Sequence, residues 1–429
     1  MHCSMILRTS RLPLLSGSKM LNEPVGILGF GVEGKSTLKF LQSKGIKDII
    51  IFDKKNGKNY LENLSSCKTI IRSAGVYPLQ KEILDAQAKG AELTSQIELF
   101  FELYPPAQII GVTGTLGKGT CVSMISHCLK ALNIRHSVGG NFGIPALDLL
   151  QEQNSIAVLE LSSFQLMTLG ISPHIGVVLQ TTSEHLDWHT SVEQYRDAKA
   201  NLVRWQKRND YCIYNAASEG AVQIAAQSGA IKKPFKTLPL SMDEFKVKGE
   251  HQLQNMAAAT LALECAGMDV SFCIDALKSY EALPFRLQNI GTKIFKNKTL
   301  TFYNDSYSTR PEAAIAAVKA MDKPFTVILG GSEKNADFTE LSQTLAKNSL
   351  LKGLALIGFT AERMLKSLQN ENCKANMQIC DGLPQAFEWC LENSTDGGAT
   401  LLSPACASFG LFANYKERGE KFNELYSWV

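Results

Sequence analysis

The stretch GVTGTLGKGT, residues 111–120, carries glycines and a lysine at the spacing of a phosphate-binding loop. Its backbone N–H groups would face an anion at a helix N-terminus, and the Lys118 ammonium suits a triphosphate. The strict P-loop pattern, GxxxxGK followed by Ser or Thr, fails because the chain has Val112 and Gly119 at two of its positions. The stretch is therefore either a nucleotide site with an altered part or a glycine-rich turn.

A carboxylate follows this loop along the chain. The stretch VLELSSFQL, residues 158–166, reads as a buried strand that carries Glu160, with Ser162 and Ser163 directly after it. A carboxylate at a strand end near a phosphate loop is where a Mg²⁺ ligand belongs. The alternative is local, since Ser162 or Ser163 would also serve as the N-cap of a helix.

Titratable side chains crowd the next loop. Within TTSEHLDWHT, residues 181–190, four of them fall within six positions: Glu184, His185, Asp187 and His189. Such density between a strand and a helix favours a site, although each residue alone is more typical of a surface or a helix cap. Lys199, in the segment YRDAK, reads by default as a solvated lysine.

Another glycine pattern precedes all of these segments. VGILGFGVEG, residues 25–34, is an apolar strand running into GxGxxG, and IKDIIIFD, residues 46–53, predicts a second buried strand that ends at Asp53. This order is typical of a Rossmann unit, whose glycines admit a pyrophosphate while an acidic residue meets a ribose. A nicotinamide-dependent oxidoreductase is the ordinary interpretation. The second phosphate loop argues against it, because few such enzymes need two.

Three polar strand ends mark the last third of the chain. They lie in FYNDSYSTRPEA (302–313), ILGGSEKNADF (328–338) and LLSPACASFGLFANYKERGEKF (401–422), and their polar residues include Asn304, Asp305, Ser306, Thr309, Lys334 and Ser408. Ligands of open α/β sheets gather at the carboxyl ends of the strands, so these segments predict a ligand-facing rim. Ordinary turn chemistry is the alternative for each of them.

Strands and helices in alternation must position all these residues. Apolar strand patterns alternate with helical ones through most of the chain, which predicts an α/β fold with parallel sheets. We expect three domains, over residues 21–106, 107–287 and 288–429, after an N-terminal extension of residues 1–20.

Composition restricts the class of partner. The chain has 429 residues, 45% of them apolar, and 44 Lys and Arg residues against 41 Asp and Glu residues give a net charge of +3. The basic residues are scattered, so we expect no nucleic acid partner. No apolar run approaches the ~18–20 residues of a membrane span. We therefore expect a soluble protein that binds small molecules. We also expect it to be a cytoplasmic monomer.

Cysteines and the N-terminal segment bear on the compartment. The 11 cysteines include no CxxC pair, which is typical of free thiols in a reducing compartment and makes a structural zinc site improbable. Residues 1–20 contain no acidic residue but three basic residues and four serines. That composition is shared by organelle transit peptides, and an upstream-started N-terminus with Met20 as the alternative start explains it equally well.

Taken together, these residues resemble the Mur ligases, the ATP-dependent amide-forming enzymes of peptidoglycan precursor synthesis. The matching segments run in the family's order: GVTGTLGKGT, GGNFGIPAL (139–147), VLELSSFQL, EHLDWH followed by YRDAK, LPFR (283–286), NDSYST, GGSEKNADF and SPACASFGLFANYKERG. They cover roughly residues 24–422. LELSSFQL and SPACAS are similar to the branch of the family that adds D-glutamate.

The resemblance implies an activity for each domain. A Rossmann-like N-terminal domain would hold the UDP-sugar, a central P-loop-type ATPase domain would bind ATP, and a Rossmann-like C-terminal domain would bind the amino acid. The implied substrates are ATP, UDP-N-acetylmuramoyl-L-alanine and D-glutamate, and Mg²⁺ is the implied cofactor. GFGVEG would then hold uridine diphosphate, so no nicotinamide is needed. The implied UDP-sugar residues are Gly31, Val32, Asp53, Lys54, Lys55, Ser73, Asn141 and Ser162.

Further roles follow from the same resemblance. ATP would be bound by Gly114, Thr115, Gly117, Lys118, Gly119, Thr120, Asn255, Arg286 and Asp305. D-glutamate would be bound by Thr309, Lys334, Ser408, Phe409 and Tyr415. The implied catalytic residues are Lys118, Glu160, His185 and Lys199, and the implied metal ligands are Glu160, His185, Thr120 and Lys199 as a carbamate. A carbamate is an anionic two-oxygen group that Mg²⁺ accepts, whereas an ammonium would repel the ion.

The chain departs from the family's pattern at several of these positions. Gly119 removes the loop hydroxyl, Leu116 and Gln252 replace asparagines, Glu184 replaces an aspartate, Tyr307 replaces a lysine and Arg310 replaces an asparagine. We expect Thr120 or Thr115 to supply the missing oxygen to Mg²⁺, directly or through a water. The cation lost at Tyr307 would have moved to Arg310.

The sequence and the family resemblance leave three functional hypotheses. The leading hypothesis is a ligase that joins D-glutamate to UDP-N-acetylmuramoyl-L-alanine through an acyl phosphate. The altered NDSYSTRPEA segment leaves room for L-glutamate or another acceptor. A non-catalytic UDP-sugar-binding protein is the alternative from another class, and a nicotinamide-dependent oxidoreductase is the third hypothesis.

Overall fold

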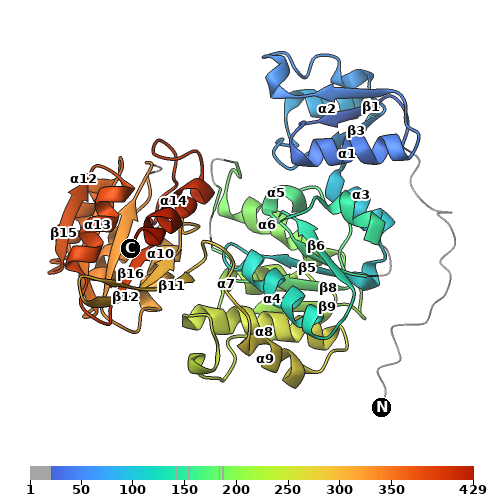
Figure 1. Ribbon diagram of the computed structural model, residues 1–429. Coiled ribbons are helices and arrows are strands. Elements are labelled where there is room, and N and C mark those ends of the chain that lie inside the picture. The colour runs from blue at the N-terminus through green and yellow to red at the C-terminus, as the bar shows by residue number, and fades with distance from the viewer. Residues whose placement is uncertain (1–20, 142, 153–154, 183, 186–187, 334) are drawn as a thin grey trace. The chain divides into compact units, whose positions relative to one another are not determined.

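The computed structural model describes residues 21–429 except 142, 153–154, 183, 186–187 and 334 (Figure 1). These residues pack into two compact units. The first unit holds the chain up to Lys118 together with residues 134–214 and 218–233, and the second unit holds residues 119–133, 215–217 and 234–429. Residues 1–20 and Lys334, both assigned roles from the sequence, lie outside the described part of the chain.

The first sheet is parallel and has four strands in the order β2-β1-β3-β4. Its elements are β1 (Val25–Leu28), α1 (Val32–Ser43), β2 (Ile49–Phe52), β3 (Thr69–Arg72), α2 (Lys81–Ala88), β4 (Glu92–Ser95) and α3 (Gln96–Leu103), with short turns η1 (Lys54–Asn56) and η2 (Leu64–Ser66). The chain leaves β1 toward β2 on one side and β3 lies on the other, so the strand order reverses beside the glycines that follow β1. Ligands of doubly wound sheets bind at such reversals.

One strand of this sheet is less buried than the sequence predicted. IKDIIIFD was expected to be a buried strand, but β2 spans only Ile49–Phe52 and three of its four residues are half-buried. Because β2 is an edge strand, it has a neighbour on one side only. The apolar run in the sequence therefore predicted more burial than the edge strand β2 has.

The second sheet has six strands in the order β10-β9-β8-β5-β7-β6. The strands are β5 (Ile109–Thr113), β6 (His136–Gly140), β7 (Ile156–Glu160), β8 (Ile175–Val178), β9 (Tyr211–Asn215) and β10 (Ile231–Phe235). The helical segments of this region are η3 (Pro106–Gln108), α4 (Lys118–Ala131), η4 (Ala146–Glu152), α5 (Ser163–Leu166), α6 (Val192–Arg204), α7 (Glu219–Ala226), η5 (Met242–Glu244), α8 (Glu250–Cys265) and α9 (Val270–Lys278). β5 pairs in parallel with β7 and β8, so residues 114–117 leave the sheet between the end of β7, which carries Glu160, and the loop after β8, which carries Glu184.

The third sheet, orange to red in Figure 1, has six strands in the order β11-β12-β16-β13-β14-β15. Its elements are β11 (Gln288–Phe295), β12 (Lys298–Asn304), α10 (Pro311–Lys319), β13 (Phe325–Gly330), α11 (Thr339–Ala346), β14 (Leu351–Ile357), α12 (Ala361–Asn370), β15 (Asn376–Cys380), α13 (Leu383–Asn393), β16 (Ala399–Leu402) and α14 (Tyr415–Ser427). Strand β13 is buried on both faces, because Val327 packs in one apolar core and Ile328 in another. This double cover explains its uninterrupted apolar sequence.

An antiparallel hairpin opens the third sheet and was not expected. β11 and β12 pair antiparallel through Lys296 and Asn297, whose φ angles are 45° and 65°. Positive φ at both central residues is what a tight two-residue hairpin turn requires, and Asn-Gly is the usual sequence for it. The hairpin was missed because Lys-Asn stands where Asn-Gly is usual.

The α/β fold with parallel sheets predicted from the sequence is confirmed. Each predicted domain range holds one of the three sheets. The domain boundaries themselves stay predictions. Among the described residues, no helix has both the length and the apolarity that crossing a bilayer requires.

Candidate active site

The glycine loop between β5 and α4 is held in a shape that only glycine adopts easily. Gly114 has φ 150° and Gly117 has φ 84°, and a Cβ on Gly114 would lie 2.8 Å from Leu179 Cβ. The loop is tied to the neighbouring strand end, because Thr115 N donates to Gln180 O at 2.7 Å. Lys118 Nζ donates to Gly114 O and Thr115 O, both at 2.9 Å, so its ammonium lies over the loop.

The two threonines proposed to replace the missing loop hydroxyl differ in their surroundings. Thr115 Oγ1 lies 2.9 Å from the Tyr195 hydroxyl and accepts from Thr182 N at 3.0 Å. Thr120 lies in the first turn of α4 and is 7% exposed. The Thr115 hydroxyl is therefore already hydrogen-bonded within the protein. Thr120 is the better candidate to supply an oxygen to Mg²⁺.

Glu160 ends β7 and is 3% exposed. Its Oε1 accepts from Asn141 Nδ2 at 2.7 Å, while no described group hydrogen-bonds to its buried Oε2. A buried carboxylate oxygen without a donor is costly unless a ligand or ion partners it. Oxygen of this kind is what Mg²⁺ prefers, so Glu160 fits the metal role that the sequence implied.

Lys199 is buried in α6, which corrects the default reading of a solvated lysine. Its Nζ donates to Gly114 O at 2.9 Å and to Thr113 Oγ1 at 3.4 Å, and lies 4.7 Å from the centre of the Tyr195 ring. Burial, and then the nearby Lys118 charge, hold the pKa of Lys199 well below its usual value. Its amine is therefore held toward the neutral, nucleophilic form.

The loop of clustered titratable residues separates into two environments. His185 has φ 56° and a 41% exposed side chain, with its Nε2 3.7 Å from Glu184 Oε2. His189 is fully buried, and its Nε2 lies 3.0 Å from Ser163 Oγ. His189 is thus a core residue, whereas His185 stands at the surface. Asp187 lies outside the described residues, and those described contain no cluster of three His, Cys, Asp or Glu side chains able to hold a metal.

In the first domain, Asp53 holds together the loop after β1, which carries the GxGxxG pattern. Its carboxylate accepts from Phe30 N at 2.6 Å and from Lys55 N at 2.9 Å, and the bond from Lys55 and then the one from Phe30 lower its pKa. A Cβ on Gly34 would lie 2.2 Å from Gly29 O, whereas one on Gly31 would meet nothing. The chain needs Gly34 for its own packing, and Gly31 leaves open space for a ligand to approach the backbone.

The other first-unit residues assigned to the UDP-sugar have plain local roles. Ser73 Oγ donates to Gly29 O at 2.8 Å across the strand-order reversal. Ser162 caps α5 in a reciprocal pair with Gln165, so the local alternative raised by the sequence holds for this side chain. Val32, Lys54 and Lys55 are exposed near the glycine loop.

In the second unit, Arg286 lies on Tyr307. The guanidinium carbon is 3.6 Å from the centre of the Tyr307 ring, and that ring meets the ring of Tyr415 edge-on at 4.9 Å. The family's lysine position is thus filled by an aromatic face that carries an arginine. Among the described residues assigned to D-glutamate, Thr309 is half-buried, Ser408 is buried and Phe409 is 55% exposed. These residues therefore differ widely in exposure.

Asp305 and Asn255 are engaged by the protein itself. Asp305 accepts from Leu287 N at 2.8 Å and from Ser403 Oγ at 2.7 Å, and burial raises its pKa to about 6. Asn255 Nδ2 donates to Gln252 Oε1 at 3.1 Å. Asp305 therefore holds the segments around Leu287 and Ser403, whereas the Asn255 bond lies within α8.

Sequence reasoning missed several polar residues that connect distant segments of the chain. Arg72, Glu33 and Gln165 join the first sheet to α5, and Arg418 donates from α14 to Ser306 and Cys406. The available signal was a charge inside an apolar strand, as in KTIIRSAG, where Arg72 interrupts the pattern. Such a residue is rarely buried without partners.

Two protein families match parts of the chain. The Mur ligase middle domain matches residues 112–244, and the Mur ligase glutamate ligase domain matches residues 286–406. The first range contains Lys118, Glu160 and Lys199. The second contains Asp305 and Tyr307.

Curated relatives align along nearly the whole chain. The UDP-N-acetylmuramoylalanine--D-glutamate ligase of Acetivibrio thermocellus is 30% identical over 464 residues, which cover 96% of this chain and 97% of that protein. The enzyme of the same name from Aquifex aeolicus is 32% identical over 416 residues, which cover 93% and 97%.

Solved structures share the fold at lower identity. The UDP-N-acetylmuramate-alanine ligase MurC from Thermotoga maritima gives a TM-score of 0.59 at 16% identity, over 94% of this chain and 99% of that one. E. coli FolC, solved with DHPP and ADP, gives 0.56 at 16% identity, over 78% and 92%. These two likenesses establish the fold alone. Because relatives at 30% identity or more align over almost their full length and both family domains are present in order, the chain belongs to the Mur ligase family.

Proposed function

We propose that this Mur ligase joins D-glutamate to UDP-N-acetylmuramoyl-L-alanine and consumes ATP in peptidoglycan precursor synthesis. The names of the curated relatives support this choice of substrates. The observation that carries the proposal is the pair of Glu160, with one unpartnered buried oxygen, and Lys199, with a buried amine, both in the unit that holds Lys118.

Lys199 is proposed to carry a carbamate. A neutral amine attacks CO₂, forms an N–C bond and loses a proton, which leaves an anionic group with two oxygens. Burial and the Lys118 charge lower the pKa of Lys199 and so favour the form of the amine that reacts. The modification would also remove the mutual repulsion of two cations at the glycine loop.

Mg²⁺ is proposed to be held by Glu160, the carbamate of Lys199, His185 and Thr120. When bound, the ion supplies charge neutralisation to the phosphates of ATP. Lys118 lies over the loop carbonyls and would bind the β- and γ-phosphates, with the backbone N–H groups of Gly114 to Thr120 around them.

The reaction needs an activated carboxyl group. A carboxylate oxygen of the substrate's alanine attacks the γ-phosphorus of ATP, the bond to the bridging oxygen breaks, and ADP leaves. The amine of D-glutamate then attacks the carbonyl carbon of the acyl phosphate and expels inorganic phosphate, with loss of one proton from the nitrogen. Exclusion of water protects this intermediate from hydrolysis.

The remaining assignments rest on the resemblance. Gly31 and Ser73 would lie beside the uridine diphosphate, Asn141 beside the muramoyl group, and Arg286 beside the adenosine. Thr309, Lys334, Ser408, Phe409 and Tyr415 would surround D-glutamate. We also propose that the chain acts as a monomer in the cytoplasm.

A panel of amino acids tests this function. Purified protein with UDP-N-acetylmuramoyl-L-alanine, ATP and Mg²⁺ should release phosphate only when D-glutamate is added. Release with L-glutamate or another acceptor instead would support the altered-acceptor alternative, which Tyr307 and Arg310 favour. Binding of the UDP-sugar with no phosphate release for any acceptor would support a non-catalytic protein. The relatives give no support to a nicotinamide-dependent oxidoreductase.

A further inference from the structure

One carboxylate joins three elements of the first unit. Glu33 lies in the first turn of α1, between Gly31 and Gly34 of the GxGxxG pattern. Its Oε2 accepts from Ala74 N at 2.7 Å, in the loop after β3, and its Oε1 accepts from Gln165 Nε2 at 2.8 Å, in α5. Both loops that flank the strand-order reversal of the first sheet are thereby connected to the second sheet's α5.

The amide of Gln165 can take only one orientation in this arrangement. Its Oε1 accepts from Ser162 N at 3.2 Å, which completes the N-terminal cap of α5, and its Nε2 is left to donate to Glu33. The cap begins two residues after Glu160. The contact with Glu33 therefore reaches the strand end that carries the proposed metal ligand.

Arg72 forms a second connection between the same elements. The side chain is 1% exposed and donates to Ala74 O at 3.2 Å, Val76 O at 2.8 Å and Phe164 O at 3.0 Å. Burial lowers the pKa of Arg72 to about 10, and the charge of Glu33 opposes that shift, so the guanidinium stays charged at neutral pH. The loop after β3 lies between a buried cation and a carboxylate.

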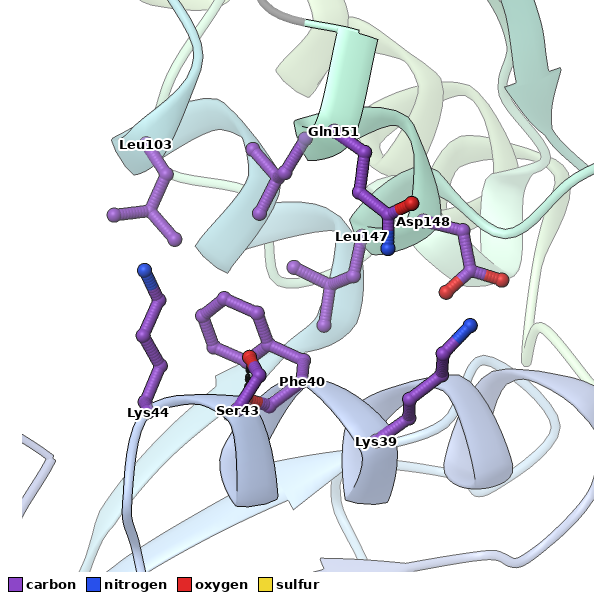
Figure 2. Close-up of a pocket in the computed structure, with 9 residues that line it drawn as sticks. Lys39, Phe40, Ser43, Lys44, Leu103, Leu147, Asp148 and Gln151 are labelled. Atoms are coloured by element: carbon purple, nitrogen blue, oxygen red, sulfur yellow. Dashed lines mark hydrogen bonds between the residues drawn. The ribbon is translucent and has the colours of Figure 1, made fainter.

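The rest of this junction is less tightly packed. Farther along α1, a cavity of about 200 Å³ separates the helix from α3 and η4. Figure 2 shows Phe40 and Lys44 of α1 on one side of it and Leu103 and Leu147 on the other. The contacts of Glu33 thus lie at the N-terminal end of α1, away from this cavity.

We propose that Glu33 and Gln165 are a positioning pair that fixes the UDP-binding loops of the first sheet relative to the strand end carrying Glu160. This inference rests on the proposed function, in which one substrate extends from the first site to the second. A displacement of about 1 Å at a reacting group can cost about 100-fold in rate, so a fixed spacing has kinetic value. Arg72 braces the same loop from its other side.

An exchange of the two side chains tests the pair. In Glu33→Gln an amide donor meets the Gln165 amide or Ala74 N–H, and in Gln165→Glu two carboxylates face each other. In the double variant the amide introduced at position 33 accepts from Ala74 N–H and donates to the carboxylate introduced at position 165, whose other oxygen accepts from Ser162 N–H. We expect each single variant to lower kcat/KM for UDP-N-acetylmuramoyl-L-alanine by about 10- to 100-fold. The double variant should recover to within about 3-fold of wild type, with KM for ATP unchanged throughout.

One control separates positioning from stability. Ser36→Ala removes the 2.9 Å hydrogen bond from Ser36 Oγ of α1 to Asp148 Oδ1 of η4. This variant should keep kcat/KM within about 2-fold of wild type even where its melting temperature falls. Single variants with unchanged kcat/KM, or a double variant no better than the worse single one, would overturn the pairing.

Amide hydrogen exchange at Ala74 reads the same pair without turnover. Exchange should accelerate in both single variants and return to the wild-type rate in the double variant. If wild-type protein releases no phosphate, the proposed function fails, while the exchange pattern still decides whether the pair exists. Equal exchange in all four proteins would contradict it.

Discussion

Glu160 and Lys199 of the first unit are buried, whereas Tyr307 and Phe409 of the second unit are exposed. Glu160 and Lys199 are 3% and 1% exposed, whereas Tyr307 and Phe409 are 38% and 55% exposed. A buried carboxylate oxygen without a donor, and a buried amine with a lowered pKa, are unfavourable in the protein alone. The exposed side chains cost nothing and so give no such indication of their ligand.

This difference teaches which chemistry the structure can specify. In the first unit, the unpartnered oxygen of Glu160 and the lowered pKa of the buried Lys199 amine are the observations on which the proposed Mg²⁺ and carbamate rest. In the second unit, Tyr307 contacts both Arg286 and Tyr415, and these three side chains leave no unpartnered buried polar atom that would indicate a particular ligand. The predictions below therefore test the first unit by loss of function and the second by a smaller shift in affinity.

Loss of the Lys199 amine should have the largest effect. Lys199→Gln and Lys199→Arg should each lower kcat by about 10³-fold or more, because neither side chain can form a carbamate. Phosphate release measures the effect, and Lys207→Gln, at an exposed lysine, is the matched control. An active Lys199→Arg enzyme would show that a cation suffices at this position and would rule out the carbamate.

Glu160→Gln should lower kcat by about 10²- to 10³-fold through loss of a metal oxygen. The same change removes a buried charge, so in Mg²⁺-free buffer the melting temperature should equal or exceed that of wild type. Calorimetry and phosphate release measure the two quantities. Retained activity combined with a lower melting temperature would assign Glu160 a structural role instead.

The two loop threonines should respond differently. Thr120→Val should raise the half-saturating Mg²⁺ concentration by about 10-fold, since one oxygen is lost from the proposed site. Thr115→Val should leave that concentration unchanged and lower the free energy of unfolding by about 1–3 kcal/mol, because Thr182 N–H loses its acceptor. Mg²⁺ titrations and denaturant unfolding decide between them. If both variants leave the Mg²⁺ requirement unchanged, Glu160 and water must suffice.

The smallest effect is expected at Tyr307. Tyr307→Phe keeps the ring beneath Arg286 and should change KM for ATP by less than about 2-fold. Tyr307→Ala removes the ring and should raise that KM by about 3- to 10-fold, in line with the strength of a cation–π contact. Equal KM values in the two variants would show that the ring does not position Arg286.

The fold was predictable wherever strands are covered on both faces. PFTVILGG and VLEL read as strands because both sides of β13 and β7 are buried, and a continuous apolar run follows from that burial. The edge strand β2 and the hairpin of β11 and β12 were misjudged or missed. Their sequences lack the alternation or the Asn-Gly turn that would have revealed them.

The site was predictable in its residue types but not in their surroundings. Spacing pointed to Lys118 and Glu160, whereas Lys199 looked like a surface residue until the family resemblance singled it out. Burial of one lysine, the cap made by Ser162 and the contact of Glu33 with Gln165 depend on segments far apart in the chain. No local pattern contains that information.

The carbamate on Lys199 is the central claim, and carbon NMR of protein equilibrated with ¹³C-labelled bicarbonate tests it most directly. Wild-type protein should show a carbamate carbonyl signal that is absent from Lys199→Gln, and bicarbonate-depleted enzyme should regain activity when bicarbonate is restored. A spectrum without that signal, together with full activity after removal of CO₂ and bicarbonate, would contradict the account.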